Sequence, residues 1–354
     1  MSKTKGNVID PLELVDGYGA DATRFTLAAM AAQGRDMRLA MSRVEGYRNF
    51  VTKLWNAARF LEINSCARAE AYEPRQNKLS LNKWIVSATA KAVADVTKGI
   101  TDYRFNEAAN SAYDFVWGTF CDWYLELAKP VLTGDDAAAK YETQATAAYV
   151  LDQILKLLHP FMPFVTEELW TETGKVGPKR DKMLILTRWP DMKTLIDARA
   201  DEEMEWLIAL VSGIRSVRTE MNVPAGAKIP LLVVGAGAET GTRIETHLPS
   251  LLRLARLESV DYTSDVPRGS AQIVLNEATF VLPLEGVINI GAERLRLDKE
   301  IAKIDDDVEK VDRKLGNQQF VSKAPPEVIE EQRNRRDEAM LRREKLAAAL
   351  KRLN

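Results

Sequence analysis

The chain has 354 residues, of which 46% are hydrophobic and 28% charged, and its formal net charge is -2. These values are typical of an ordinary globular protein, and the length indicates two or three domains at roughly 100–200 residues each. A net charge this small excludes a global attraction to nucleic acid, so any such surface must be a local patch. Its two cysteines exclude a disulfide framework and a cysteine-based zinc site. No run approaches the ~18 apolar residues of a membrane helix, so we expect a cytoplasmic protein without membrane contact.

Two short helices are predicted near the beginning of the chain. Pro11 can occupy the first turn of a helix that the stretch DGYGA ends, and residues 20–32 resume helical character. Asp21 and Arg24 stand three residues apart, a spacing that predicts a weak local ion pair.

From residue 43 to about residue 172 the chain is strongly helical. Apolar residues in 43–63 step by three and four and predict one buried seam: Val44, Tyr47, Val51, Leu54, Ala58 and Leu61. Further helices are expected at about 80–100, 104–129 and 137–158, with a short one after Pro163. Tryptophans at helical spacing in apolar patterns are predicted to be core residues: Trp55, Trp117, Trp123 and Trp170. Antiparallel packing of these helices predicts a helical bundle.

Residues 175–291 change in character. MLILTRWP is a candidate short strand, and 201–221 is predicted to be helical. KIPLLVVGAG, ESVDYTS, SAQIVLNE and TFVLPLEG are short β-rich runs, with a helix around 240–256 between the first two. This alternation predicts a small α/β module.

The end of the chain predicts a coiled-coil hairpin. Apolar residues repeat with alternating spacings of four and three: Leu297, Ile301, Ile304, Val308, Val311 and Leu315. A Gly- and Pro-containing turn follows, and a second charged helix runs from about residue 326 to the end. The fold class is therefore mainly α: a helical bundle, a small α/β module and a C-terminal antiparallel coiled-coil hairpin.

Residues 332–354 hold eight Lys or Arg residues against three acids. The arginines that we single out as candidate phosphate contacts are Arg333, Arg335, Arg336, Arg342 and Arg343. A local basic excess on a protruding hairpin can follow a phosphate backbone, but it is equally compatible with a solvated coiled-coil face.

Phe60 lies off the apolar seam of its helix, in line with Asn49, Lys53 and Asn56. An aromatic side chain on a polar, basic helical face can stack an unpaired base, although it can also pack under a neighbouring helix. No nucleophile motif, phosphate-binding glycine loop or metal-ligand cluster occurs, so no complete active site and no metal site are predicted.

Several stretches resemble the valyl-tRNA synthetases, which are class I aminoacyl-tRNA synthetases. MSKTKGNVIDPLELVDGYGADATRF is similar to the KMSKS loop of that class and the residues behind it. KLWNAARF, FCDWYLEL and HPFMPFVTEELW resemble the helical anticodon-binding domain, and IRSVRTEMNVP and NQQFVSKAPPEVI indicate the valine member. The resemblance covers essentially the whole chain.

The resemblance implies roles for particular residues. Met1, Ser2, Lys3 and Thr4 correspond to the ATP loop, and Lys3 is the lysine expected to contact the ATP phosphates in the intact, Mg-dependent enzyme. A flexible ammonium suits that role because it can follow a departing pyrophosphate. The loop departs from the family pattern in lacking a lysine before Met1 and in having Thr4 as its final residue.

The resemblance also implies tRNA(Val) as partner. It makes Phe60 a candidate for stacking on the anticodon, Arg43 a candidate anticodon contact, and the hairpin arginines candidates for contacting the corner of the tRNA. The Rossmann domain, the amino-acid pocket and the editing domain of the family are absent from these 354 residues. We therefore expect tRNA binding without aminoacylation by this chain alone, no bound cofactor, a monomer, and a missing N-terminal catalytic half as second partner.

Two other functions remain open from the sequence. One is a freestanding tRNA- or RNA-binding module from a truncated gene, and the other is a helical scaffold that binds proteins. The domain boundaries that we predict are 1–42 for the ATP loop and its helices, 43–195 for the anticodon-binding domain, 196–291 for the α/β module and 292–354 for the coiled-coil arm.

Overall fold

The computed structural model describes residues 10–31, 39–316 and 326–352. The chain divides into two compact units, Met1–Glu205 and Trp206–Asn354, and helix α9 (Ala198–Glu220) crosses the boundary. The mainly α fold class predicted from the sequence is confirmed.

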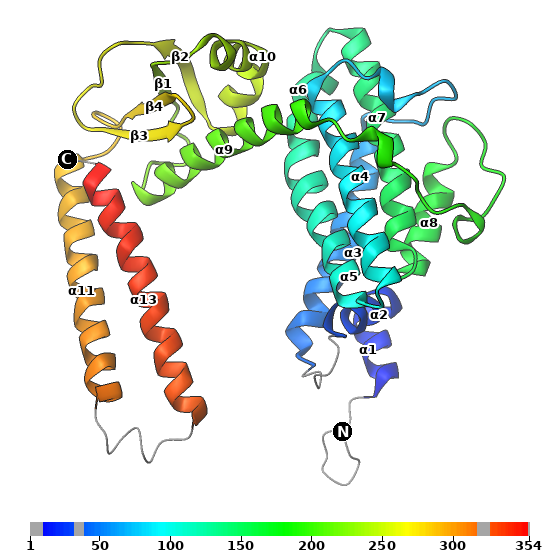
Figure 1. Ribbon diagram of the computed structural model, residues 1–354, viewed down its shortest axis with the longest axis horizontal. Coiled ribbons are helices and arrows are strands. Elements are labelled where there is room, and N and C mark those ends of the chain that lie inside the picture. The colour runs from blue at the N-terminus through cyan, green and yellow to red at the C-terminus, as the bar shows by residue number, and fades with distance from the viewer. Residues whose placement is uncertain (1–9, 32–38, 317–325, 353–354) are drawn as a thin grey trace. The chain divides into compact units, whose positions relative to one another are not determined.

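The first unit is a helical bundle (Figure 1). Its helices are α1 (Pro11–Tyr18), α2 (Ala20–Met30), α3 (Met41–Ile63), α4 (Ser80–Thr101), α5 (Phe105–Asp114), η3 (Phe115–Tyr124), α6 (Leu125–Thr133), α7 (Ala137–Leu158) and α8 (Pro163–Thr173). Helix η3 is a π-helix that continues α5 into α6 without a break. Helix α4 packs against both α5 and α7, and α2 packs against α3.

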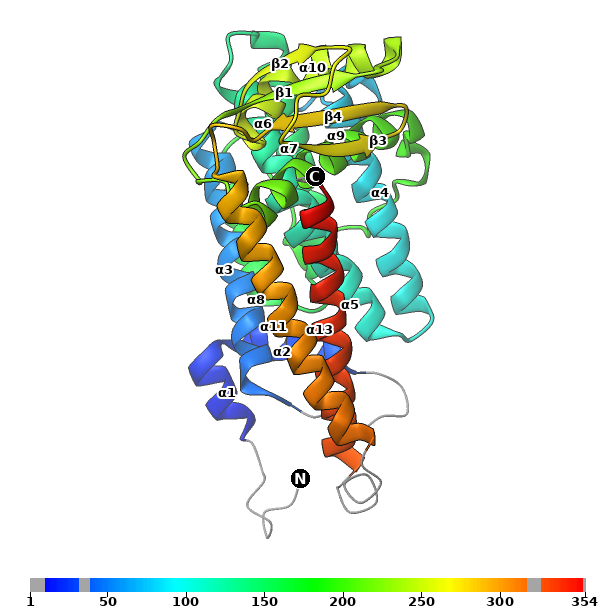
Figure 2. The same cartoon turned by 90° about the vertical axis from the view of Figure 1, so that its left-hand side faces the viewer.

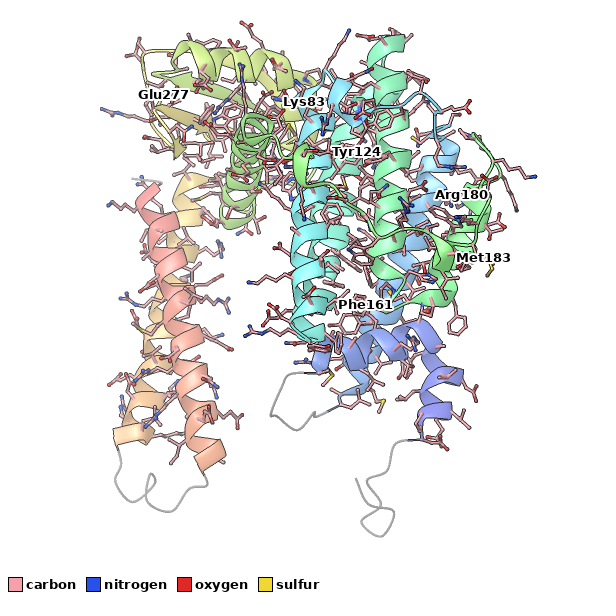
Figure 3. The ribbon with its side chains drawn as sticks, turned by 45° about the vertical axis from the view of Figure 1, so that its right-hand side comes forward. Lys83, Tyr124, Phe161, Arg180, Met183 and Glu277 are labelled. Atoms are coloured by element: carbon pink, nitrogen blue, oxygen red, sulfur yellow. The ribbon has the colours of Figure 1, made fainter. Side chains whose placement is uncertain are left out.

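A buried polar network lies at the centre of the bundle. Tyr124 is fully buried (Figure 3), and its hydroxyl donates to Asn82 Oδ1 at 3.2 Å. Asn82 in turn donates to Glu142 and to Thr143 Oγ1 on α7. Burial raises the pKa of Tyr124 well above its ordinary value, so the phenol stays protonated and able to donate. Because each buried polar group has a partner, the network fixes how α4, η3 and α7 pack.

Asp21 and Arg24 do not pair with each other as the sequence predicted. The Asp21 carboxylate is only 8% exposed and accepts the backbone N–H groups of Phe164 at 3.1 Å and Val165 at 2.6 Å. Arg24 donates to the carbonyl oxygens of Pro160 and Phe161. These contacts attach α2 to the first turn of α8, where unpaired N–H groups favour an anion.

The predicted strand MLILTRWP is wrong. Leu184–Leu186 and Lys193–Leu195 form 3-10 turns. The Glu167 carboxylate accepts the N–H groups of Leu184 at 2.7 Å and Ile185 at 3.3 Å, which holds the first turn against α8. Met183 stays exposed at the outside of the bundle (Figure 3).

The second unit contains a four-stranded sheet in the order β2-β1-β4-β3. Its strands are β1 (Ile229–Val234), β2 (Leu257–Tyr262), β3 (Ser270–Leu275) and β4 (Ala278–Pro283). Strand β1 is parallel to β2, to which α10 (Ala238–Leu254) connects it, and antiparallel to β4. Strands β3 and β4 form a hairpin in the register Ser270↔Pro283 to Leu275↔Ala278.

Two long helices form the arm of the second unit: α11 (Ile290–Gly316) and α13 (Pro326–Arg352). Figure 2 shows them side by side. Ion pairs join Asp305 of α11 to Arg343 of α13 and Asp312 of α11 to Arg336 of α13. The residue number rises along one helix and falls along the other, so the two helices are antiparallel. The predicted antiparallel hairpin is confirmed, and the predicted seam residues Leu297, Ile304 and Val311 are buried.

Candidate nucleic-acid interface

The residues predicted to contact ATP lie outside the described part of the chain. Met1, Ser2, Lys3 and Thr4 precede residue 10, where the description begins. The described chain starts with Asp10, whose carboxylate caps α1 by accepting the Leu12 N–H at 2.9 Å. The role of Lys3 therefore stays a prediction.

Phe60 lies near the end of α3 and is half-buried. The ammonium of Lys129, on α6, lies 5.6 Å from the centroid of its ring, and Lys129 also pairs with Glu126. A cation within about 6 Å of a ring is attracted to the electron-rich face. Phe60 thus lies partly against α6 and remains partly accessible, and its role in stacking on a base stays a prediction.

Lys53 lies on the same face of α3, about two turns closer to the start of the helix. Its ammonium pairs with Asp122 Oδ1 at 2.8 Å and lies 5.1 Å from the centroid of the Trp117 ring. The hydrogen bond with Asp122 raises the pKa of Lys53, so the cation is retained at neutral pH. Both partners belong to the π-helix η3, and π-helical turns occur frequently at functional sites.

Aromatic side chains next to this face were not recognised from the sequence. Trp117 stacks on Tyr113 with ring centroids 5.7 Å apart, and Tyr113 contacts both Tyr47 and Phe50. Trp117, Tyr113 and Tyr47 are half-buried, so their rings connect the core to the surface of α3 and η3. The four-residue spacing of Tyr113 and Trp117 was the available signal, although it predicts burial as readily as exposure.

The tryptophans predicted to be core residues differ in burial. Trp170 is buried, whereas Trp117 and Trp123 are half-buried and Trp55 is 40% exposed. The prediction is therefore correct for Trp170 and wrong for Trp55. Trp55 follows the apolar seam residue Leu54 by one position, and that shift of about 100° turns it away from the core.

Arg43 and Phe60 cannot contact the same nucleotide base. Arg43 is exposed in the first turn of α3, and Phe60 is 17 positions further along the helix. At a rise of about 1.5 Å per residue, the two positions are separated by roughly 25 Å. The structure thus places Arg43 at one end of α3, and Lys53 and Phe60 toward the other.

The five arginines of the arm fall into two groups. Arg336, Arg342 and Arg343 pair with Asp312, Glu300 and Asp305 of α11, at 3.7, 3.7 and 2.5 Å. Arg333 and Arg335 are exposed, and neither forms an ion pair with another residue in the described ranges. Helix α11 carries eight acids and seven bases, so it offsets part of the basic excess of α13.

Little in the described chain could hold a metal. Within the described ranges, no three His, Cys, Asp or Glu side chains are grouped as ligands. His159 is held by Thr166, whose Oγ1 lies 2.8 Å from Nδ1, and its Nε2 lies 4.0 Å from Glu167. Both cysteine thiols have pKa values raised to about 12 by burial, which makes them poor thiolates. None of the helices in the described ranges is both long enough and apolar enough to cross a membrane.

Two family models define the class of protein. Residues 82–233 match the anticodon-binding domain of tRNA ligase, and residues 1–40 match tRNA synthetases class I (I, L, M and V). Helices α4 to α8 of the bundle therefore correspond to the anticodon-binding domain of a class I aminoacyl-tRNA synthetase, whereas α3 lies between the two matched ranges.

The arm and the whole-chain similarity identify the family more closely. Residues 289–354 match the tRNA-binding arm of valyl-tRNA synthetase. The chain is 56% identical to the valine–tRNA ligase of Rhizobium meliloti and 54% identical to that of Caulobacter vibrioides, in both cases over all 354 residues. The chain belongs to the valine–tRNA ligase family, and it spans 37% and 39% of the length of these two relatives.

A third relative and one solved structure add to the comparison. The valine–tRNA ligase of Brucella suis is 52% identical over 353 residues, and the chain spans 39% of its length. The LeuRS–tRNA–LeuAMS complex of Agrobacterium radiobacter aligns with 74% of this chain and 31% of its own, at 16% identity and a TM-score of 0.43. That structural likeness is too weak to support a conclusion.

Proposed function

We propose that this chain is the tRNA-binding part of a valine–tRNA ligase, the enzyme that attaches valine to tRNA(Val) with ATP. The observation that carries the proposal is the 56% identity over the whole chain, joined with the matches to an anticodon-binding domain and a tRNA-binding arm. A chain with a net charge of -2 requires local surfaces for this purpose, and the α3–η3 face and the arm are suited to it.

The α3–η3 face is proposed to bind the anticodon loop. Phe60 offers a partly exposed ring on which an unpaired base can stack, and Lys53 with Trp117 continues the same face. Stacking strength varies with the base, and a Lys–Asp pair offers both a donor and an acceptor to base edges, so both contacts can favour one anticodon. Arg43, at the far end of α3, is proposed to contact the nucleic acid at a different nucleotide.

The arm is proposed to contact the corner of the tRNA through phosphates. Arg333 and Arg335 can bind phosphate without first giving up an ion pair in the described part of the arm. Arg336, Arg342 and Arg343 already join α13 to α11, so they are proposed to act mainly by holding the arm together. From the sequence alone, all five arginines were equal candidates for phosphate contact.

ATP and Mg are proposed as cofactors of the intact enzyme, with Lys3 of the loop Met1–Thr4 at the ATP phosphates. The catalytic half is the proposed second partner, and the chain is proposed to be monomeric and cytoplasmic. Alone, it is expected to show no ATP–pyrophosphate exchange. Appreciable exchange by the purified chain would refute this assignment.

The anticodon proposal is tested by measuring the affinity of the chain for tRNA(Val) and for tRNA(Val) with a mutated anticodon. Phe60→Ala is expected to reduce the preference for the natural anticodon by about tenfold, since stacking contributes roughly 1–3 kcal/mol per base. Phe164→Ala is the matched control, because Phe164 is a 64% exposed phenylalanine on α8. Equal discrimination by Phe60→Ala and the control would refute the role of Phe60.

The arm proposal is tested by the salt dependence of binding. Arg333→Gln/Arg335→Gln is expected to weaken both tRNAs equally and to lower the slope of log affinity against log salt by roughly 1–2. Arg104→Gln is the control, since Arg104 is an exposed cation of the bundle that pairs with Glu107. An unchanged slope would refute phosphate contact at these arginines. Equal affinity for unrelated RNA would instead favour a freestanding RNA-binding module.

A further inference from the structure

A cavity of about 420 Å³ lies inside the first unit, away from the α3–η3 face. Helices α3, α7 and α8 and the segments around Arg68 and Val176 form its walls. Trp55, on α3, lines the cavity, whereas Phe60 does not. Five residues correspond to a rotation of about 140° around a helix, so Trp55 and Phe60 face nearly opposite directions.

In one part of the polar wall the Asp152 carboxylate joins two guanidinium groups, and the lining also includes Arg59, Lys175, Glu62 and Glu172. Arg180 Nη2 lies 2.5 Å from Asp152 Oδ1, and Arg68 Nε lies 3.9 Å from Asp152 Oδ2. The side chains of Arg180 and Asp152 are only 7% and 13% exposed, so solvent compensates this charge weakly. Four cations and three carboxylates line the cavity altogether, so its lining carries one net positive charge.

Burial lowers the pKa of the cations at this wall, and the Asp152 carboxylate opposes that shift more strongly than the neighbouring arginines add to it. Burial lowers the pKa of Arg180 to about 10, and Arg68 adds to that effect. Burial also lowers the pKa of Lys156, and Arg180 contributes to the shift. An anion that binds nearby stabilises the charged form of a cation whose pKa burial has lowered.

The two arginines differ in their freedom to bind a ligand. Arg180, labelled in Figure 3, is fixed, because its guanidinium stacks 3.6 Å from the centroid of the Trp170 ring and donates to the Trp170 carbonyl and to Thr173. Arg68 donates to the Pro178 carbonyl, but its side chain remains 20% exposed and its pair with Asp152 is long. Arg68 is therefore the group that an entering anion can reach.

Another part of the lining is apolar. Leu61, Leu151 and Leu169 line the cavity together with Trp55, and Val176, 59% exposed, lies at its margin. Sites for small molecules usually have volumes of roughly 300–1,000 Å³, apolar walls and a few convergent polar groups. The cavity has this composition.

We propose that this cavity is a binding site for a small organic anion, with its carboxylate, sulfonate or phosphate at Arg68 and its apolar body against Trp55 and the three leucines. The site is independent of the proposed tRNA contacts, because it opens on a different side of α3. A neutral molecule of the same shape fills the same apolar volume but gains nothing at Arg68. The charge of the ligand thus distinguishes this site from a simple hydrophobic cavity.

The test uses the full chain and two fluorescent probes of similar shape, anilinonaphthalenesulfonate, which is anionic, and phenylnaphthylamine, which is neutral. The wild-type chain is expected to bind one equivalent of the anionic probe saturably. Val176→Trp, which fills the margin of the cavity, is expected to weaken both probes by about tenfold or more. Arg68→Gln is expected to weaken the anionic probe by about tenfold and to leave the neutral probe unchanged.

Two surface variants serve as controls. Ile63→Trp adds a tryptophan at a 73% exposed position of α3 outside the cavity lining, and Arg104→Gln removes a cation elsewhere on the bundle. Both should bind both probes as the wild type does. Circular dichroism reports whether each variant folds. If Arg68→Gln fails to fold, probe binding by Val176→Trp decides the outcome. The proposal is overturned if the wild type shows no saturable binding, if Val176→Trp behaves like Ile63→Trp, or if a folded Arg68→Gln retains full affinity for the anionic probe.

Discussion

Replacing Asp21 by alanine should loosen the junction between α2 and α8. The Asp21 carboxylate accepts two backbone N–H groups from the first turn of α8, those of Phe164 and Val165. Alanine leaves both donors without this partner. Because Asp21 is 8% exposed and Val165 is buried, water can replace the lost acceptor only after the junction opens.

The magnitude follows from the two bonds and their burial. Loss of a helix-capping side chain costs about 0.5–2 kcal/mol, and a buried donor left unpaired adds roughly 1–3 kcal/mol. We expect Asp21→Ala to lower the free energy of unfolding of the first unit by about 2–3 kcal/mol. For a unit of roughly 200 residues this corresponds to a fall in Tm of about 4–12 °C.

The assay combines thermal unfolding with hydrogen exchange read by mass spectrometry on peptides that contain residues 160–170. Asp21→Ala should accelerate exchange there, and Asp21→Asn, which keeps one acceptor oxygen but no charge, should lie between wild type and Asp21→Ala. Asp95→Ala is the matched control, because Asp95 is exposed in the middle of α4. It should change stability by less than about 0.5 kcal/mol.

Two outcomes would refute the reasoning. If Asp21→Ala and Asp95→Ala unfold at the same temperature, the two bonds contribute no net stability. If Asp21→Ala destabilises the protein but exchange in 160–170 stays slow, the loss arises elsewhere than at the start of α8.

Three further predictions concern other parts of the fold. Burial lowers the pKa of His159 below its ordinary value of 6.5, so the unfolded chain binds the proton more tightly than the folded chain. The first unit should therefore lose stability as pH falls through about 6.5. Denaturant unfolding of His159→Asn should show a flatter pH dependence of stability, and an unchanged dependence would contradict this. Gly99→Ala places a Cβ 2.8 Å from the Cβ of Ala108 and should lower the free energy of unfolding, measured by chemical denaturation, by about 1–3 kcal/mol. Gly46→Ala, with open space around it, should instead stabilise α3 by up to roughly 1 kcal/mol. Equal effects of the two variants would show that α4 and α5 can move apart. A double-mutant cycle on Asp305 and Arg343 should give a small favourable coupling that decreases with salt. Zero coupling at low salt would show that this pair does not help to set the register of the arm.

The sequence by itself determined the helices, the strands of the α/β module and the hairpin of the arm. The reason is that these elements have a local physical signature: three-four spacing for α3 and α11, and short β-rich runs between turns for β1 to β4. The same signature predicted the buried positions Leu54, Leu61, Leu297 and Ile304, because a helix with one apolar stripe has only one way to bury it. The family resemblance, which rests on quoted motifs, was confirmed by similarity over the whole chain.

Only the tertiary structure decided where polar and aromatic side chains find their partners. Asp21 and Arg24 are near in sequence, yet both bind residues about 140 positions away, because the first turn of α8 offers unpaired backbone groups and the first turn of α2 lies against it. Trp55 and Trp170 have similar sequence contexts, but one is exposed and the other lies under Arg180.

In the arm, too, the sequence does not predict which charged side chains pair. Its basic excess is visible in the sequence, but the separation of Arg333 and Arg335 from the arginines paired with α11 depends on the register between two helices. The positive cavity wall likewise combines Arg68, Asp152 and Arg180, from three separate segments. Periodicity reports which side of an element is buried, whereas pairing across elements depends on distances that only the packed chain defines.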